Sequence, residues 1–315
     1  MLDRPPGSAT IASVNASHAS DITLVDVAAG KAFPCAPAGS VLLSSVPFGW
    51  RGIIVERHRL QPQELPEHYV VGHGVSVSTS ARPIPFGWRG GRGWREGVLN
   101  PSDCHLLTDG EFNTPRWLHT FDQVSLVLAP RFVADVVREG LPADRVEFAT
   151  QRSRSDATIA SYTNAFLSEL AADAPNGGLY ADTLTIGFVL HLLSTYAIAK
   201  PKISLPRGKL NSFQLRSVVD FVQSHLTEDV SLLALAEQAH VSPFHFARQF
   251  RATVGLPPHQ FVLRQRVQRS LRLIKAGRLP LAQIAVESGF HDQPHFTRAF
   301  RRVLGTTPGI YSSRM

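Results

Sequence analysis

The sequence predicts an α+β protein with a β-rich N-terminal region followed by helices, and an all-helical C-terminal module of two helix-turn-helix units. Three observations support this. Residues 20–130 hold short apolar runs between Gly, Pro and Asn, residues 130–199 change to a helical period, and residues 245–261 recur in similar form at 295–311. The 315 residues suffice for two domains, each with its own core.

The β-rich region contains apolar runs at 40–46, 52–60, 69–80 and 123–130. Several short strands at this spacing predict a barrel or a sandwich. Residues 1–20, rich in Ser and Ala, have no basic stretch followed by an apolar segment, so we expect a poorly ordered tail and no secretion signal. No apolar run is long enough to predict a membrane span.

Two cysteines, Cys35 and Cys104, lie outside any C-x-x-C or zinc-finger spacing. A disulfide framework is therefore not expected, which fits a reducing cytoplasm, and both are predicted to be buried small side chains.

The hexapeptide PFGWRG occurs at 47–52 and again at 85–90. One interpretation is a repeated turn with Gly49 and Gly87 at its tip and the tryptophans packed on the sheet. The other is that Trp and Arg line an effector pocket or partner surface, which makes weak effector-binding candidates of Trp50, Arg51, Trp88 and Arg89. The spacing does not decide between them.

Residues 129–141 predict a short amphipathic helix, and 156–173 and 180–199 predict an antiparallel helical pair. The last helix is apolar around much of its circumference, so it needs cover on more than one side. It is expected to pack on the β-rich region and, as a hypothesis, on a second copy of the chain. Residues 200–210, with two prolines, a glycine and four cations, predict an extended linker between parts 21–199 and 211–315.

The chain carries a net charge of +7, and its positive charge gathers at the C-terminal end. Residues 206–315 hold 15 Lys and Arg against 6 Asp and Glu, a net of +9, whereas the remainder has 17 against 19, a net of −2. A basic module attached to a near-neutral one favours a polyanionic partner.

The two basic units share matched helix starts and turns. Ser242 is a suitable N-cap before Pro243, and Asp292 is expected to cap the helix that starts near Gln293. In the second unit Gly289 can adopt the left-handed turn conformation, whereas His240 holds that place in the first and predicts slight strain. A long helix between the units is expected to fix their separation.

In each second helix, phenylalanines at i and i+4 face the core and arginines lie off that stripe. Helix-turn-helix proteins read bases with the N-terminal residues of this helix, and arginine fits guanine well. The candidate base contacts are Phe244, Ala247, Arg248, Gln293, Pro294, His295 and Arg298. Arg251, Arg301 and Arg302 follow a turn later and are candidate phosphate contacts.

Residues 235–262 and 281–311 resemble the tandem helix-turn-helix domain of AraC/XylS-type transcription regulators. The A-x-x-x-G-F segment at 285–290 and the G-x-x-P-x-x-Y ending at 305–311 carry the resemblance most specifically. It implies a seven-helix DNA-binding domain over about 210–315 and, in layout only, a cupin-like β-barrel that binds a small molecule, with helices that dimerise. His240, Ser270 and Pro294 depart from the usual pattern, and Pro294 is expected to alter preference at one base.

The resemblance predicts a cytoplasmic, effector-responsive regulator that binds promoter or operator DNA as a homodimer and meets RNA polymerase there. We expect an activator, and the sequence itself leaves activator and repressor both open. We expect no enzyme activity, cofactor or membrane partner. Two alternatives stay open: a non-specific architectural DNA-binding protein, or a metal-dependent cupin-like enzyme fused to a DNA-binding domain. The metal candidates are His58, His68, His73, Cys104, His105 and His119, but the spaced His and Glu signature of metal-binding cupins is absent. No nucleophile or acid–base constellation is present either.

Overall fold

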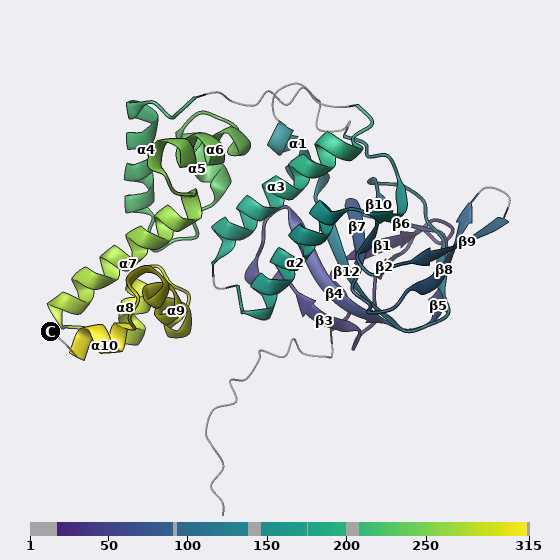
Figure 1. The fold of residues 1–315 in the computed structure, drawn as a ribbon, viewed down its shortest axis with the longest axis horizontal. Helices are drawn as coiled ribbons and strands as arrows, with labels where there is room; N and C mark the ends of the chain where they lie inside the picture. Colours follow the sequence, from purple (N-terminus) through teal and green to yellow (C-terminus); the bar gives the residue numbers. More distant parts are fainter. Residues whose placement is uncertain (1–17, 91–92, 138–145, 175, 200–207, 314–315) are drawn as a thin grey trace, which may run out of the picture.

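A computed structural model describes residues 18–90, 93–137, 146–174, 176–199 and 208–313, and it is of the predicted α+β class. The tail at 1–17 and most of the expected linker lie outside these residues. Figure 1 shows the sheets on one side, the helical module on the other, and α3 between them. No helix in the described part is long and apolar enough to cross a membrane.

The strands are short and pair antiparallel into three sheets, with orders β2-β1-β6, β13-β10-β7-β12-β4-β3 and β5-β11-β8-β9. The described pairings do not close into a single barrel. The strands are β1 (Thr23–Asp26), β2 (Ala32–Pro34), β3 (Val41–Ser44), β4 (Ile53–Leu60), β5 (Gln63–Glu64), β6 (His68–Val70), β7 (His73–Ser78), β8 (Ile84–Gly90), β9 (Gly93–Leu99), β10 (Asp103–Leu107), β11 (Pro115–Trp117), β12 (Phe121–Leu128) and β13 (Gln151–Ser155).

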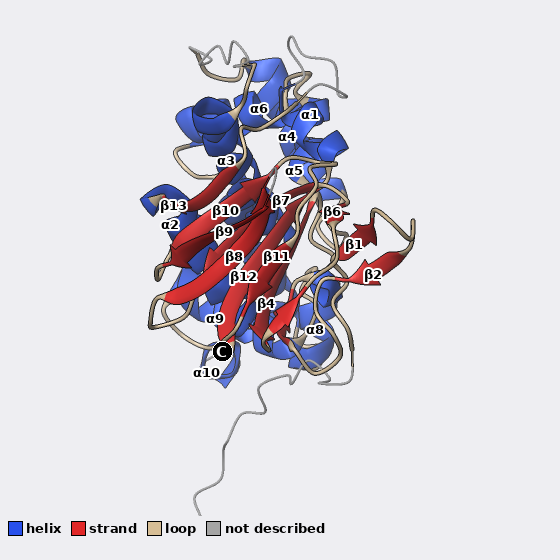
Figure 2. Ribbon diagram, turned by 90° about the vertical axis from the view of Figure 1, so that its right-hand side faces the viewer, coloured by secondary structure: helices blue, strands red, loops and turns tan. Residues whose placement is uncertain are grey.

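The six-stranded sheet is centred on β12, which pairs with β4 along its whole length and with β7. Val124, Leu126 and Leu128 alternate along β12, and all three are fully buried. Side chains two residues apart share one face of a strand, so these three place one face of the sheet in the core. The apolar runs at 52–60 and 123–130 thus form the predicted strands. Figure 2 shows the sheets as stacked red arrows with helices above and behind them.

The two PFGWRG segments adopt different structures. The first begins inside a short 3-10 helix, Val46–Phe48, and Gly49, which ends that helix, has the left-handed φ of +59° that a turn needs. The second lies within β8, where Gly87 pairs with both β9 and β11. The repeated-turn interpretation is therefore right for the first copy and wrong for the second, because two flanking strands hold Gly87 in an extended sheet.

The helices outside the C-terminal module are α1 (Pro130–Val137), α2 (Ala157–Ala171) and α3 (Gly178–Tyr196). The Asp156 side chain caps α2 by accepting from the N–H groups of Thr158 and Ile159. Both predicted helices of the antiparallel pair are present. The wide apolar circumference of α3 is explained within the chain, because α3 contacts α1 and α2 on one side and α5, α6 and α7 on the other. The sequence argument for a second chain at this helix therefore loses its basis.

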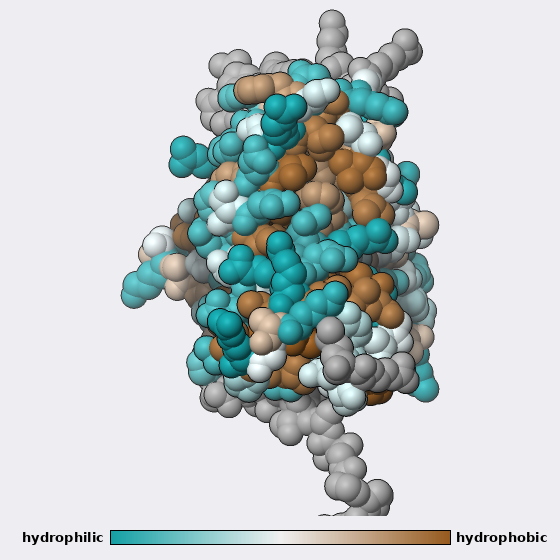
Figure 3. All heavy atoms as spheres, turned by 90° about the vertical axis from the view of Figure 1, so that its left-hand side faces the viewer, coloured by the Kyte–Doolittle hydropathy of each residue, from teal (hydrophilic) through white to brown (hydrophobic). Residues whose placement is uncertain are grey.

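The C-terminal module contains α4 (Ser212–Ser224), α5 (Leu232–Gln238), α6 (Pro243–Val254), α7 (Pro258–Ala276), α8 (Leu281–Glu287), α9 (Gln293–Leu304) and α10 (Pro308–Ser313). Phe246 and Phe250 belong to a core continuous with α3 and the sheet, whereas Phe296 and Phe300 belong to a separate core of the second unit. The face that points away from the sheets carries hydrophilic side chains across its centre, with apolar ones in scattered clusters (Figure 3).

Candidate functional site

The two helix-turn-helix units use the local devices that their sequences predict. Ser242 Oγ accepts from the His245 N–H at 3.4 Å at the start of α6, and Asp292 Oδ1 accepts from the His295 N–H at 2.6 Å at the start of α9. The turn before each cap contains a left-handed residue, with φ +55° at His240 and +86° at Gly289. The predicted strain at the first turn is confirmed, since His240 holds a backbone conformation that favours glycine.

Helix α7 joins the units through arginines that reach backbone carbonyls on both sides. Arg266 donates from Nε to the Leu226 carbonyl at 2.9 Å and from Nη2 to the Glu228 carbonyl at 2.7 Å, in the first unit. Arg269 donates from Nε to the Glu287 carbonyl at 2.7 Å, in the second unit. Charged donors make strong hydrogen bonds, so α7 holds the spacing and orientation of the two units.

The candidate DNA contacts differ in exposure. Arg248, Arg251, Gln293, Pro294, Arg298, Arg301 and Arg302 are exposed. Phe244 and Ala247 are half-buried and pack against the large core. His295 is 9% exposed and meets the Phe290 ring edge-on, with centroids 5.3 Å apart. Arg248 and Arg298 therefore hold equivalent, solvent-facing places on α6 and α9, whereas His295 is the least accessible candidate.

One of these arginines contacts the helical pair. Arg302 on α9 donates to the side-chain oxygen of Asn176, in the connection between α2 and α3. Asn176 in turn donates two hydrogen bonds to the Glu169 carboxylate, both at 2.6 Å. The pKa of Glu169 is raised, chiefly by burial. The hydrogen bonds from Asn176 and the charges of Arg302 and Arg298 act in the opposite direction and lower it. The arginine face of α9 is thus next to a carboxylate of the α2–α3 pair.

The four weak effector candidates do not come together. Trp50 packs against Phe166 of α2, and Arg51 forms an exposed salt bridge with Asp229 of the helical module at 3.0 Å. Trp88 stacks on Phe86, with centroids 5.1 Å apart, while Arg89 points to solvent. None of the four lines the apolar cavity between the sheets.

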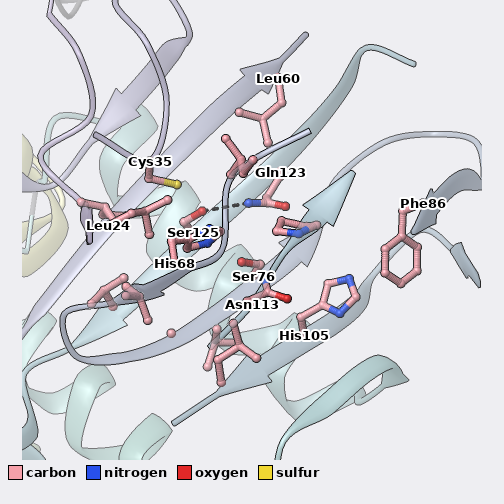
Figure 4. A pocket seen from close by; sticks show the side chains of 18 of the residues that line it. Leu24, Cys35, Leu60, His68, Ser76, Phe86, His105, Asn113, Gln123 and Ser125 are labelled. Carbon is pink, nitrogen blue, oxygen red and sulfur yellow. Dashed lines mark hydrogen bonds between the residues drawn. The ribbon is translucent and has the colours of Figure 1, made fainter. Parts of the chain in front are cut away.

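That cavity, of about 120 Å³, lies where the three sheets face one another (Figure 4). Most of its wall is apolar, with Leu24, Leu60, Phe86 and Trp117 among the lining side chains. Polar groups come from a few places, and Figure 4 shows Ser76, His105, Asn113, Gln123 and Ser125 around the same space. A concave apolar site with a few convergent polar groups is the usual form of a small-molecule site.

The titratable groups of His68, His105 and Cys35, which line the cavity, are neutral near pH 7. Burial lowers the pKa of His68, and burial together with the charge of Arg152 lowers the pKa of His105 to about 4. Burial and the negative charge of Glu56 raise the pKa of Cys35 to about 12. Cys35 and Cys104 are both free thiols.

The candidate metal ligands are scattered. His58 is fully buried and hydrogen-bonds Glu56 at 2.9 Å, and His73 Nδ1 accepts from the Asp109 N–H at 3.1 Å. Among the described residues, no three His, Cys, Asp or Glu side chains come together in a way that could hold a metal ion.

Reasoning from the sequence did not predict which residues line the apolar cavity between the sheets. It had selected His68 and His105, but only as candidate metal ligands. The cavity wall combines residues from β1, β4, β6, β7, β8, β9, β10, β11, β12 and β13, which long-range pairing brings together. The only local signal was the alternation of apolar residues in the strands.

Comparison with known proteins assigns the C-terminal part. A family model described as a helix-turn-helix domain matches residues 235–314. The probable transcriptional regulator LumQ of Photobacterium leiognathi is 32% identical over 103 residues, which cover 33% of this chain and 42% of that protein. A putative AraC-like transcription regulator of Streptomyces antibioticus is 31% identical over 134 residues, covering 42% of this chain and 44% of that protein. The matched part therefore spans less than half the length of these two relatives.

Among solved structures, the DNA-binding domain of the global transcriptional factor AdpA, in complex with a target DNA, is 32% identical to this chain. The overlap covers 33% of this chain and 93% of that domain, with a TM-score of 0.31.

Proposed function

Because the C-terminal part of this chain is a tandem helix-turn-helix domain of the AraC type, we propose that the protein is a sequence-specific regulator of transcription. The observation that carries the proposal is the equivalent placement of Arg248 and Arg298. Each is exposed on the second helix of its unit, and α7 fixes the two helices relative to each other. Such an arrangement suits two consecutive segments of one DNA duplex.

We further propose that α6 and α9 enter the major groove and read bases with their N-terminal halves. Arg248, Gln293, Pro294 and Arg298 are exposed for this role, and Phe244 and Ala247 would offer apolar contacts. Arg251, Arg301 and Arg302 would hold phosphates, which position the protein without specifying sequence. His295 stays a prediction as a base contact. Arg302 would have to exchange Asn176 for a phosphate when DNA binds.

For the N-terminal part we propose a cupin-like effector domain over residues 21–199, connected by a linker at 200–210. Support comes from the cavity where the three sheets meet and from the contacts of α3 with the DNA-binding module. Through α3, a ligand in the sheets has a packed route to α5, α6 and α7. A homodimer and a contact with RNA polymerase are predictions that follow from the family resemblance; light scattering of the full chain tests the first.

The proposed function is tested by selecting fragments of the native genome on the purified full chain and sequencing them. Fluorescence anisotropy then compares the selected site with a scrambled duplex over a salt series. We expect the selected site to bind about 10³-fold or more tightly than the scrambled one, with affinity that falls steeply with salt. Equal affinity for both duplexes would favour the architectural alternative. A stoichiometric metal in the purified protein would revive the enzyme alternative.

A further inference from the structure

The apolar cavity between the sheets has one formally charged side chain among the described residues that line it. Of the described residues that line it, only Arg152 is ionised at neutral pH, since no Asp, Glu or Lys is among them and the two histidines and the cysteine are neutral. Burial lowers the pKa of Arg152, but a guanidinium stays protonated at any physiological pH. Arg152 is half-buried, and a charge drawn even partly out of water is costly unless something compensates it.

The protein compensates Arg152 only in part. Its Nη1 donates to Asn113 Oδ1 at 2.9 Å, and the guanidinium carbon lies 5.6 Å from the centre of the Trp88 ring. Glu111 acts on it through space, and the structure shows no salt bridge to Arg152 within the described residues. A guanidinium has five N–H donors in a planar fork, so most of the Arg152 donors are left for water or for an acceptor in the cavity.

A β-bulge places this arginine opposite His105. Cys104 pairs with Arg154 and Leu106 pairs with Gln151, so Arg152 and Ser153 together oppose the single residue His105. Ser153 has a φ of +48°, which is strained for a residue other than glycine. Bulges redirect side chains, and strain of this kind gathers at ligand sites.

The same bulge orients His105. The N–H of Ser153 points at His105 Nδ1 at 3.4 Å, so Nδ1 accepts and the proton of the neutral ring lies on Nε2. Asn113, which also lines the cavity, holds Arg152 from the other side. The polar end of the cavity therefore offers one cation and N–H donors, while the rest of the wall is apolar.

We propose that this cavity binds an organic monocarboxylate with a compact apolar body, whose carboxylate pairs with Arg152. A carboxylate matches the guanidinium fork in a bidentate pair, which gives both strength and orientation. An apolar cavity of about 150 Å³ holds a benzene ring, so one of about 120 Å³ limits the apolar body of the acid to about ring size at most, with the carboxylate at the polar end. That such an acid would regulate DNA binding rests on the proposed function; the binding itself does not.

The test uses the full chain, isothermal titration calorimetry and two probes of the same shape: benzoate and the uncharged benzamide. We expect benzoate to bind with one site per chain. Benzamide should bind at least about tenfold more weakly than benzoate. Arg152→Gln should reduce benzoate affinity about tenfold or more and leave benzamide unchanged. Arg154→Gln is the matched control, because it removes the same charge from an exposed position on the same strand and should behave as wild type.

A second measurement on the unmodified chain keeps the proposal testable if Arg152→Gln does not fold. Arginine does not titrate near neutrality and His105 is already neutral, so benzoate affinity should stay flat between pH 6 and 8. A histidine-based anion site would instead lose affinity as pH rises through about 6.5. The proposal is overturned if wild type shows no binding at about 10 mM benzoate. It is equally overturned if benzamide matches benzoate, or if Arg152→Gln keeps wild-type affinity. Anisotropy with DNA in the absence of either probe reports separately on the proposed function.

Discussion

Asp182 Oδ2 on α3 accepts a hydrogen bond from the backbone N–H of Leu232 at 3.0 Å, at the first residue of α5. The carboxylate is 5% exposed, and it meets the N-terminus of a helix in the first helix-turn-helix unit. Partial positive charge at a helix N-terminus favours a carboxylate there. This bond joins the helical pair to the helix-turn-helix module.

Replacing Asp182 by Ala should destabilise the chain by about 1–3 kcal/mol, because a buried N–H at the start of α5 loses its acceptor. Urea denaturation followed by circular dichroism measures the change. Asp229→Ala is the matched control at the same contact. Its ion pair with Arg51 is exposed, so it should cost only about 0–1 kcal/mol. Equal losses in the free energy of unfolding of both variants would show that the hydrogen bond to Leu232 stabilises the chain no more than the exposed ion pair does.

Asp182 should also make stability depend on pH. Burial raises its pKa to about 6, against the Leu232 hydrogen bond and the charge of Arg51, which lower it. The folded chain thus holds this proton more tightly than the unfolded chain does, whose pKa is near 3.8. The resulting stability is fully present below the unfolded value and is lost as pH rises through about 6.

The free energy of unfolding of wild type should therefore fall relative to that of Asp182→Asn as pH rises through this window. Taking the difference between the two proteins removes the contributions of other titrating groups. Urea titrations at a series of pH values give the comparison, and a difference that does not change with pH would contradict it.

Arg298→Ala should cost about 1–3 kcal/mol of DNA affinity and relax preference at one base pair, because a bidentate contact to guanine would be lost. Arg301→Ala, one turn later on α9, should weaken all duplexes alike and reduce the salt slope by about 0.9, as expected for one phosphate contact. Anisotropy with singly substituted duplexes separates the two patterns. A uniform loss in Arg298→Ala would reassign that residue to the phosphates.

Gly289→Ala should be severely destabilising, by more than about 4 kcal/mol. Its φ is +86°, and an added Cβ would lie 1.9 Å from the Leu226 carbonyl oxygen. Because this oxygen belongs to the backbone, it cannot easily move away. Gly305→Ala is the matched control, since Gly305 has a similar φ of +75° but open space around the new carbon. It should cost only about 1–2 kcal/mol of backbone strain. Thermal unfolding of the two variants should separate clash from strain.

His240→Gly should stabilise the chain by up to about 1 kcal/mol. The substitution removes the left-handed strain at φ +55°, and the greater entropy of an unfolded glycine offsets part of that gain. His240 is exposed, so little packing is lost. Urea denaturation measures the gain; a loss of stability would mean that the imidazole makes a contact worth more than the strain.

The structure of the C-terminal module could be predicted from its sequence because its signals are local. An N-cap, a proline at the first turn and a left-handed residue act within a few positions of themselves, so Ser242, Asp292, Gly289 and even the strain at His240 could be predicted from sequence. The core stripe of phenylalanines follows the helical period in the same way, and the exposed arginines follow from that stripe.

Tertiary structure alone decided the rest. The two PFGWRG copies share six residues, yet one is a turn and the other a strand, because β9 and β11 pair with only the second. The apolar breadth of α3 indicated a buried helix but could not identify what covers it, which is α1 and α2 on one side and the helix-turn-helix module of the same chain on the other. Arg152 lies in a segment with no motif. It faces a cavity because β10, which contains His105, 47 positions earlier in the chain, pairs with β13 around the bulge. Such a long-range pairing cannot be recognised in the local sequence.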